Sequence, residues 1–309
     1  MTVQCYAREA DRVPDGEIRT TGPALDLNPV TGDWVSVTGL AGGIARVRTR
    51  ARDGSLSVAA RGRGGPRPGA WGEVEADVFA NALSSRAGYA FAATFDGARI
   101  SSRLETYQGL GVLVVHAFHR YTDGSGRRDY FTREFYVPAD APDAPDAPDA
   151  PDAPDAADSL DAPNVADDPR DPRDPGEDSD GAMPFGPPGP PTGGNDPEPL
   201  LGAWHGLAPA ATKSIATLEC ARAGHGLAVR ACGVGTRGPV EWGWAPARLY
   251  ADAHYLDNPP AFLATFEHAY MRVHLQVRVN RGVLVVGEYT EFTDGSGRPD
   301  YFIRECYRR

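Results

Sequence analysis

The sequence predicts an all-β protein, built from two homologous antiparallel up-and-down β-barrels that a disordered acidic linker joins. Three observations lead to this fold class. The chain contains an internal duplication. Each copy consists of short segments in which apolar and polar residues alternate, as they do in strands with one buried face. Between the copies lies a segment rich in proline, alanine and aspartate, a composition that cannot form a packed core.

The duplication is clearest in "TDGSGRRDYFTREFY", residues 122–136, which recurs 171 positions later as "TDGSGRPDYFIRECY" with three differences. Other pairs at this offset are Trp71 and Trp242, Phe91 and Phe262, Phe95 and Phe266, and the "GVLVV" segments that begin at Gly111 and Gly282. The comparison divides the chain into an N-terminal extension at 1–27, a first repeat at 28–138, a linker at 139–197 and a second repeat at 198–309.

The linker contributes most of the negative charge behind the formal net charge of −11. Its prolines cannot donate backbone hydrogen bonds and its carboxylates repel one another, so we expect an extended, disordered segment and repeats that are closer to neutral. The chain has no run of about twenty apolar residues. Its N-terminus is too polar for a signal peptide, and its four cysteines have no CxxC spacing. We therefore expect a cytoplasmic protein with free thiols and no membrane span.

The strands of each repeat follow one another with Gly, Asp or Asn between them. A Gly-x-Trp segment comes first, at 32–34 and at 202–204. The next strand, "IARVRTRAR" at 44–52, places its arginines on one face. The second copy replaces three of these arginines, which argues against a nucleic-acid site. The later strands are "GYAFAATFD", "ARISSRLETY", "GVLVVHAFHRYT" and "RDYFTREFYV" in the first repeat, and "AFLATFE", "MRVHLQVRV", "GVLVVGEYTEFT" and "PDYFIRECYR" in the second.

Closing such a meander into a barrel removes its exposed edges. Two segments are more helix-like, "VEADVFANALSS" at 74–85 and "APARLYADAHYL" at 245–256, and we expect each to form a lid or a connection. The repeated "TDGSGR" is predicted to be a tight four-residue turn. Its glycines supply positive φ, and its aspartate supplies a short side chain that suits a turn.

Each repeat opens with Gly-x-Trp and carries an arginine on its last strand, Arg133 or Arg304. This pairing resembles the calycin superfamily of barrels, which includes lipocalins, fatty-acid-binding proteins, avidins and the nitrobindin type. The resemblance implies that the tryptophan closes one end of each barrel and that the arginine packs over it, which pairs Trp34 with Arg133 and Trp204 with Arg304. The lipocalin Thr-Asp-Tyr turn and C-terminal helix are not evident, so a shorter calycin-like barrel is expected.

The resemblance also implies a cup for one small, largely apolar ligand. The candidate wall residues are Trp71, Phe91, Phe95, Tyr130, Trp242, Phe262, Phe266 and Tyr301. The alternative is that these aromatic side chains fill a solid core. We expect no metal and no cofactor. A haem-binding barrel would need one axial histidine in the cup, for which only His268 and His274 are reasonable candidates.

The candidate catalytic residues are Glu134 and Glu305, which occupy duplicate positions on the last strands. In an apolar cup either carboxyl group could protonate or deprotonate a substrate, because desolvation would raise its pKa. The alternative is that these glutamates lie in water while the arginines close the barrels.

Three functions are compatible with this pattern. The leading hypothesis is a soluble tandem-barrel protein that binds a small hydrophobic molecule. The alternative is a cofactor-independent cyclase, isomerase or hydratase of small-molecule biosynthesis, which the fold-level likeness alone cannot assign. The third is a protein-interaction module in which two tethered barrels gain avidity. The repeats could move independently or pack as a pseudo-dimer.

Overall fold

The computed structural model describes residues 24–38, 43–63, 70–141, 196–207, 214–224, 226–235, 238–252 and 260–309. These residues form sixteen β-strands and two short 3₁₀-helices, and none of them lies in an α-helix. The expected all-β class is therefore confirmed. Most of the predicted linker and of the predicted N-terminal extension lies outside the described residues.

The first repeat forms a closed series of antiparallel strands, the first ring. Its elements are the 3₁₀-helix η2 (Asn28–Val30) and the strands β1 (Gly32–Ser36), β2 (Ile44–Arg52), β3 (Ser55–Gly62), β4 (Ala70–Ala80), β5 (Gly88–Asp96), β6 (Ile100–Gly109), β7 (Val112–Tyr121) and β8 (Tyr130–Pro138). Each strand pairs with the next, and β1 also pairs with β8 through residues 34–36 and 136–138. The last strand thereby returns to the first.

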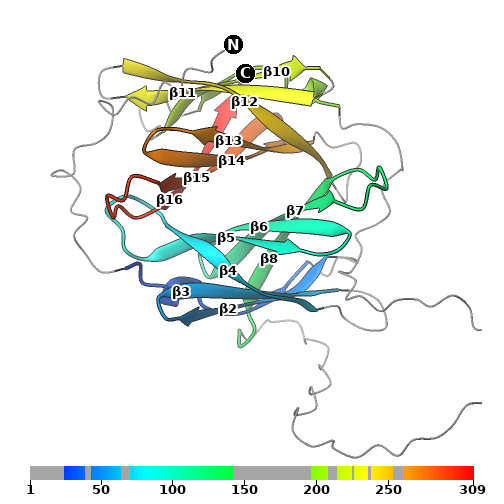
Figure 1. Cartoon of the computed structure of the whole chain (residues 1–309), viewed down its shortest axis with the longest axis vertical. Coiled ribbons are helices and arrows are strands. Elements are labelled where there is room, and N and C mark those ends of the chain that lie inside the picture. The colour runs from blue at the N-terminus through cyan, green and yellow to red at the C-terminus, as the bar shows by residue number, and fades with distance from the viewer. Residues whose placement is uncertain are drawn as a thin grey trace, which may run out of the picture.

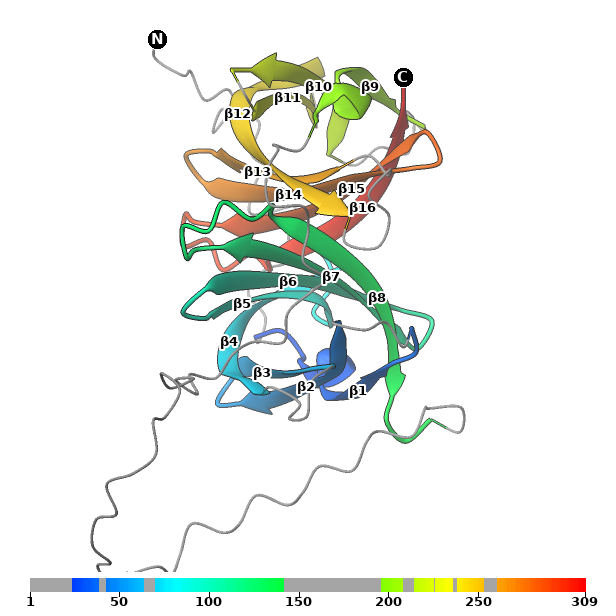
Figure 2. The ribbon, with the colours of Figure 1, turned by 90° about the vertical axis from the view of Figure 1, so that its right-hand side faces the viewer.

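The second repeat forms a second ring in the same way. Its elements are η3 (Glu198–Leu200), β9 (Gly202–Gly206), β10 (Ile215–Ala223), β11 (Gly226–Gly235), β12 (Gly238–Asp252), β13 (Ala261–Glu267), β14 (Met271–Asn280), β15 (Val283–Phe292) and β16 (Tyr301–Arg308). Consecutive strands pair, and β9 also pairs with β16. The two rings are stacked, with β13–β16 next to β5–β8 (Figures 1 and 2).

Side chains alternate between the inside and the outside of each ring. On β2, Val47 is buried and Arg48 is exposed, as predicted. The core of the first ring contains Trp34, Phe91 and Phe95, and that of the second contains Trp204, Phe262 and Phe266. Cys220 also points into the second core, and Cys220, Cys232 and Cys306 are free thiols as expected.

Most of each helix-like segment is strand in the described residues, so that prediction is wrong; residues 253–256 lie outside them. Residues 74–80 belong to β4 and residues 245–252 to β12. Val74, Ala76 and Val78 contact the core of the first ring, and these apolar residues recur at every second position. Pairing with two neighbouring strands satisfies the backbone of each segment, and this tertiary context overrides the local preference of Ala and Glu for helix.

The repeated Asp-Gly-Ser-Gly-Arg motif forms a longer connection than the predicted four-residue turn. Residues 122–129 join β7 to β8, and Gly124 and Gly126 both have φ of 69°. One oxygen of Asp123 accepts the Ser125 N–H at 3.0 Å, and the other pairs with Arg127. The second motif repeats these contacts through Asp294, Ser296 and Arg298. The arginine therefore belongs to the turn, which explains why both copies keep the motif.

The predicted packing of the last-strand arginines over the tryptophans is also wrong. Arg133 points away from the core and lies over the Phe135 ring at 4.3 Å. Arg304 lies 5.4 Å from the ring of Tyr107, which belongs to the other ring of strands. The cation over Trp204 is Arg309, at 4.7 Å. The inward side chains of β8 and β16 are instead those of the glutamates and tyrosines.

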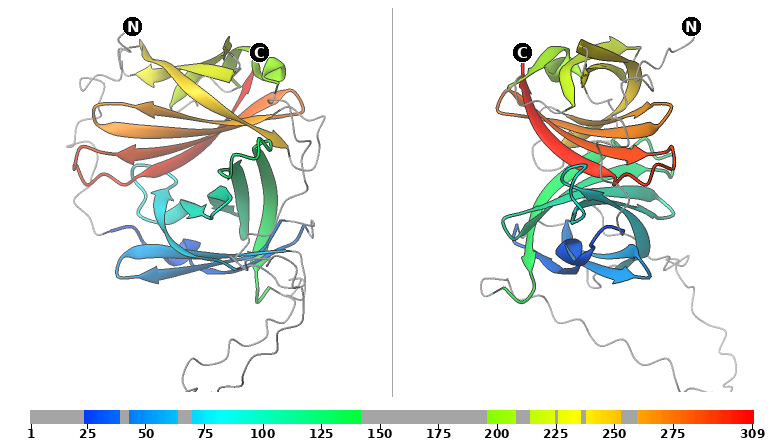
Figure 3. Two further views of the ribbon diagram at one scale, coloured as in Figure 1. Left: turned by 45° about the vertical axis from the view of Figure 1, so that its right-hand side comes forward. Right: turned by 90° about the vertical axis from the view of Figure 1, so that its left-hand side faces the viewer.

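The two rings lie against each other (Figure 3), and the contacts between them recur at duplicate positions. The Ala80 N–H donates to the Asp300 carbonyl at 2.8 Å, and the equivalent Ala251 N–H donates to the Asp129 carbonyl at 2.9 Å. Two aromatic clusters flank the middle of the contact. One contains Phe79, Tyr289 and Phe302, and the other contains the equivalent residues Tyr250, Phe118 and Phe131. The contact therefore covers Phe131 on the outer face of β8 and Phe302 on that of β16, while Arg304 and Arg308 of β16 stay exposed.

Candidate functional site

The second ring encloses a carboxylate that the sequence comparison does not single out, Glu288 on β15. Leu284 and Val286 belong to the core of this ring, and alternation along the strand turns Glu288 to the same side. Only 3% of Glu288 is exposed. A carboxyl group in such an interior must be hydrogen-bonded or protonated, because an isolated buried charge is very unfavourable.

Two hydroxyl groups meet Glu288. Ser214 Oγ donates a hydrogen bond to Glu288 Oε1 at 2.6 Å, and Thr290 Oγ1 donates to the same oxygen at 3.2 Å. Burial raises the pKa of Glu288 to about 7; the Glu305 carboxylate also raises it, while the two hydroxyls lower it. Near neutral pH this side chain is divided between its two protonation states, the condition in which a carboxyl group best exchanges protons.

The predicted residues Glu305 and Tyr301 lie close to Glu288. Glu305 is half-buried on the inner face of β16, and its carboxylate accepts a hydrogen bond from the Tyr307 hydroxyl at 3.1 Å. The same hydroxyl lies 2.8 Å from the Ile215 carbonyl, so its single hydrogen is shared between these two acceptors. Burial raises the pKa of Tyr307 and of Tyr301, and nearby glutamates raise both further. The structure thus brings two glutamates and two tyrosines together inside the second ring.

Aromatic side chains and one histidine lie elsewhere in this interior. Trp242 contacts Phe266 edge-on at 5.6 Å and His268 at 5.2 Å between ring centroids. Burial lowers the pKa of His268 to about 4, so the imidazole is neutral at pH 7. Neither ring nitrogen of His268 has a hydrogen-bond partner. A buried donor and a buried acceptor are therefore left for a bound molecule or water.

The first ring holds its equivalent glutamate in a different way. Glu134, the duplicate of Glu305, is 1% exposed. It accepts hydrogen bonds from Ser36 Oγ at 3.0 Å, the Ile44 N–H at 3.2 Å, the Tyr136 hydroxyl at 3.4 Å and Thr38 Oγ1 at 3.5 Å. These donors join β1, β2 and β8. The alternative that the glutamate lies in water is therefore wrong for Glu134, which acts as a structural tie.

Two substitutions between the copies explain this difference. A Cβ atom on Gly43 would overlap Glu134 Oε1, so the close approach of the carboxylate needs glycine there. Ser214 occupies the equivalent position in the second ring, and its hydroxyl meets Glu288. The first ring has Ala117 in place of Glu288. The hydrogen bond between Ser214 and Glu288 is therefore specific to the second ring.

The predicted wall residues of the first ring gather around another buried histidine. Trp71 contacts Phe95 edge-on at 5.5 Å, and the His119 ring stacks on Tyr130 at 4.5 Å. His119 Nδ1 lies 2.8 Å from Ser102 Oγ. Burial lowers the pKa of His119 to about 3, so the imidazole is neutral. The sequence does not single out His119, because His116 lies three residues before it on the same strand. Two histidines at that spacing point to opposite faces and cannot share a metal site.

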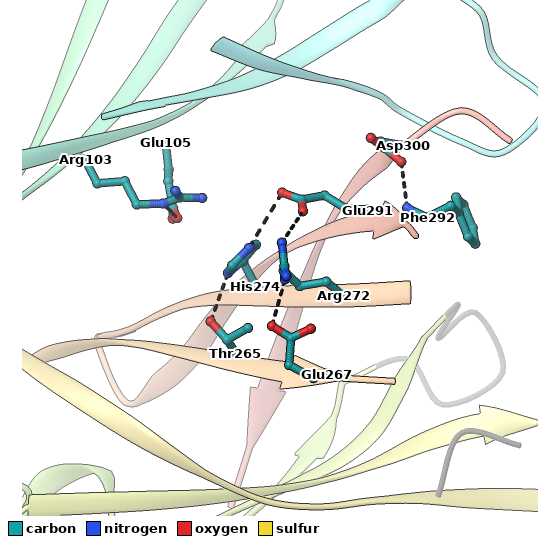
Figure 4. A network of polar contacts seen from close by, with 9 residues as sticks. All are labelled: Arg103, Glu105, Thr265, Glu267, Arg272, His274, Glu291, Phe292 and Asp300. Carbon is teal, nitrogen blue, oxygen red and sulfur yellow. Dashed lines mark hydrogen bonds and ion pairs between the residues drawn. The ribbon is translucent and has the colours of Figure 1, made fainter. Parts of the chain in front are cut away.

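A second polar network lies outside the rings, where they meet (Figure 4). Glu291 lies 3.6 Å from His274 Nε2 and accepts a 3.5 Å hydrogen bond from Arg272. Burial lowers the pKa of His274 to about 4, so its contact with Glu291 is not an ion pair at pH 7. His274 Nδ1 lies 2.9 Å from Thr265 Oγ1 on the same outer face. His274 therefore cannot serve as an axial ligand inside the ring.

Asp300 belongs to this network, and its raised pKa should make the stability of the protein depend on pH. Burial raises the pKa of Asp300 to about 6, and the carboxylates of Glu291 and Asp77 contribute. Between about pH 4 and 6 the folded state binds more protons than the unfolded state, so stability falls as the pH rises through this window. Asp300→Asn should therefore raise the free energy of unfolding by about 1–2 kcal/mol at pH 8 and have little effect at pH 4. Urea unfolding at the two pH values measures this.

The duplicate position supplies the matched control. Asp129 Oδ1 accepts the Tyr121 N–H at 3.0 Å, just as Asp300 Oδ1 accepts the Phe292 N–H at 2.8 Å. The other oxygen of Asp129, however, pairs with Arg248 at 3.0 Å. Asp129→Asn should not stabilise the protein at pH 8. Equal effects of the two variants would contradict the assignment.

No protein-family model matches this sequence, and no curated protein matches it significantly. Among the described residues, no group of three or more His, Cys, Asp or Glu side chains could hold a metal ion. The same part of the chain contains no helix long and apolar enough to cross a membrane.

Proposed function

We propose that the chain is a tandem of two calycin-like β-barrels packed as a pseudo-dimer, and that the second barrel binds one small, largely apolar molecule whose polar group meets Glu288. The observation that carries the proposal is Glu288 itself. It is an ionisable side chain in an interior of aromatic and aliphatic residues, where carboxylates are rarely buried, and the two hydroxyls that bond to it supply no positive charge. The unpaired nitrogens of His268 support a ligand that also carries a hydrogen-bonding group.

The barrel part of the proposal rests on the pairing of β1 with β8 and of β9 with β16. The pseudo-dimer rests on the contacts that recur at duplicate positions between the rings. The candidate wall of the cup comprises Trp242, Phe262, Phe266 and Tyr301 in the second barrel. The equivalent residues Trp71, Phe91, Phe95 and Tyr130 form the wall of the first barrel, which has no counterpart of Glu288.

Binding of a neutral apolar dye such as Nile red should depend on the protonation of Glu288. A dye that displaces water from this carboxyl group makes its charged form still less favourable, so binding is coupled to proton uptake. We expect the affinity to fall by up to about tenfold for each pH unit above 7. Fluorescence titration between pH 6 and 9 measures this. In Glu288→Gln the affinity should not change over the same range.

Glu291→Gln is the control, because this residue lies on the outer face of the same strand. It should keep the pH dependence of the wild type. Absence of dye binding at every pH, together with native mass spectra free of any copurified small molecule, would reject the binding proposal.

A cofactor-independent cyclase, isomerase or hydratase is the second candidate function. The observation that favours it is the proximity of Glu288 and Glu305, because a carboxyl group with a pKa of about 7 can act as acid or base. If the barrel transfers protons to carbon, a copurified ligand incubated in D₂O should acquire deuterium, and Glu288→Gln should stop the exchange. Deuterium uptake in the variant at the wild-type rate would exclude Glu288 from that role.

A further inference from the structure

Three arginines and one histidine meet where the two rings are in contact. Arg133 on β8 and Arg304 on β16 occupy duplicate positions, so the repeated contact brings them together from opposite rings. Arg133 is the cross-strand partner of His116 on β7. The ring of Tyr107 connects the two sides of the group. Its centroid lies 6.1 Å from that of the His116 ring, which stacks on it, and 5.4 Å from the Arg304 guanidinium carbon.

Arg278 on β14 completes the group, which we call the arginine cluster. It stands at the position equivalent to Tyr107, so the second ring has a cation where the first has a phenol. Arg278 is 9% exposed and His116 is 2% exposed. Burial lowers the pKa of Arg278 to about 10, and the charges of Arg133 and Arg304 lower it further. Burial and the same three arginines lower the pKa of His116.

The arginine cluster has no internal counter-charge. In the described part of the chain, no carboxylate forms an ion pair with Arg133, Arg278 or Arg304, whereas Arg46, Arg230 and Arg272 each pair with at least one acidic side chain. The Nε atoms of Arg133 and Arg278 and both nitrogens of His116 are buried without a hydrogen-bond partner. The Glu105 carbonyl lies near the His116 ring and favours its proton, but it does not meet hydrogen-bond geometry.

Such an arrangement is unfavourable without a ligand. Arg278 is buried and Arg133 is partly buried, whereas Arg304 is exposed. Guanidinium groups placed near one another repel, and each buried N–H without an acceptor, such as Nε of Arg133 and of Arg278, adds a desolvation cost. The buried Glu105 carboxylate, on the strand next to His116, pairs with Arg103 at 2.8 Å, and the Asp77, Glu291 and Asp300 carboxylates lie in the other network of this contact. A bound anion would remove both costs, because the planar fork of arginine matches the oxygens of phosphate or carboxylate groups.

We propose that the arginine cluster is a binding site for a tetrahedral oxyanion of the phosphate class, either free or as the terminal group of a small metabolite. The anion would join Arg133 of the first ring to Arg278 and Arg304 of the second and so stabilise the contact between them. His116 would hydrogen-bond to it. The site is separate from the interior of the second ring and does not depend on Glu288.

Inorganic phosphate should therefore stabilise the full-length protein beyond the effect of ionic strength. We expect a saturable rise of the melting temperature in phosphate and none in sodium chloride of equal ionic strength. Arg278→Met should weaken phosphate binding by about tenfold or more, since it removes a charged hydrogen-bond donor. The same variant should be more stable than the wild type in phosphate-free buffer, because it relieves the repulsion. A purely structural arginine would not give that second result.

Arg50→Met is the matched control, since Arg50 is an exposed arginine on the outer face of β2. It changes the net charge equally and should leave phosphate binding unchanged. Arg278→Lys keeps the charge without the planar fork, so it should fold and bind phosphate more weakly than the wild type. Tighter binding of phenyl phosphate than of inorganic phosphate would identify a metabolite's terminal group; the reverse would identify the free ion. Equal responses of the wild type, Arg278→Met and Arg50→Met would overturn the proposal.

Discussion

Glu134→Gln is expected to destabilise the protein by about 2–4 kcal/mol at neutral pH. The carboxylate accepts hydrogen bonds from Ser36, from the Ile44 N–H and from Tyr136, and it is 1% exposed. Glutamine has the same shape, but its NH₂ group donates hydrogen bonds, and the groups that surround it here are donors as well. The strands β1, β2 and β8 would then lose their common acceptor. Urea unfolding followed by the fluorescence of the five tryptophans, which lie in both repeats, measures the loss.

Glu305→Gln tests the same chemistry at the duplicate position. Glu305 is half-buried and accepts the Tyr307 hydroxyl, a bond that an amide oxygen can keep. The expected loss is below about 1 kcal/mol. Gly43→Ser should reproduce the effect of Glu134→Gln, because any Cβ at this position displaces the carboxylate. If both glutamine variants proved equally mild, Glu134 would not be the tie that its contacts indicate.

The strands could be predicted because a half-buried strand shows its period of two directly in the sequence. Val47 and Arg48 illustrate this, since one faces the core and the next faces water. The last strand of each repeat gave no such contrast. Its outer face is partly covered by the other ring, so on β8 Phe131 and Tyr136 are both buried although they point in opposite directions. The sequence therefore could not decide whether Glu134 or Arg133 points inward.

Glu288 was missed for a related reason. It lies in "GVLVVGEYTEFT", two positions after Val286, which is on an inward face. A charged residue at an inward position is a usable signal for a site. The duplication drew attention to positions that both copies share, whereas the buried hydrogen bond of the second ring joins two positions that differ between the copies, Ser214 and Glu288. Differences between duplicated copies are therefore as informative as identities.

The arginine cluster also could not be predicted from the sequence. Arg278 lies on β14 and Arg133 on β8 of the other ring, and only the contact between the rings brings them together. The resemblance to calycins assigned Arg133 and Arg304 to the tryptophans. Their actual place is on the outer faces of β8 and β16, where Arg133 is partly buried at the contact between the rings and Arg304 is exposed.

Tyr289→Ala is expected to cost about 3–5 kcal/mol and to uncouple the two rings. Tyr289 is fully buried at the contact between them. Its ring lies 5.1 Å from that of Phe79 in the first ring, and its hydroxyl donates to the Thr106 carbonyl at 3.2 Å. Truncation leaves a cavity between the rings while the core of each ring stays intact. Calorimetry should then show two separate unfolding transitions in place of one.

Two controls separate loss of coupling from loss of stability in one ring. Tyr289→Phe removes only the hydrogen bond to Thr106 and should cost about 1 kcal/mol with a single transition. Leu284→Ala opens a cavity of similar energetic cost inside the second ring, where Leu284 belongs to the core and does not contact the first ring. It should lower the transition temperature without splitting the transition, because the coupling through Tyr289 and Phe302 is intact. A single transition in Tyr289→Ala, at the temperature of Tyr289→Phe, would mean that this aromatic cluster does not couple the rings.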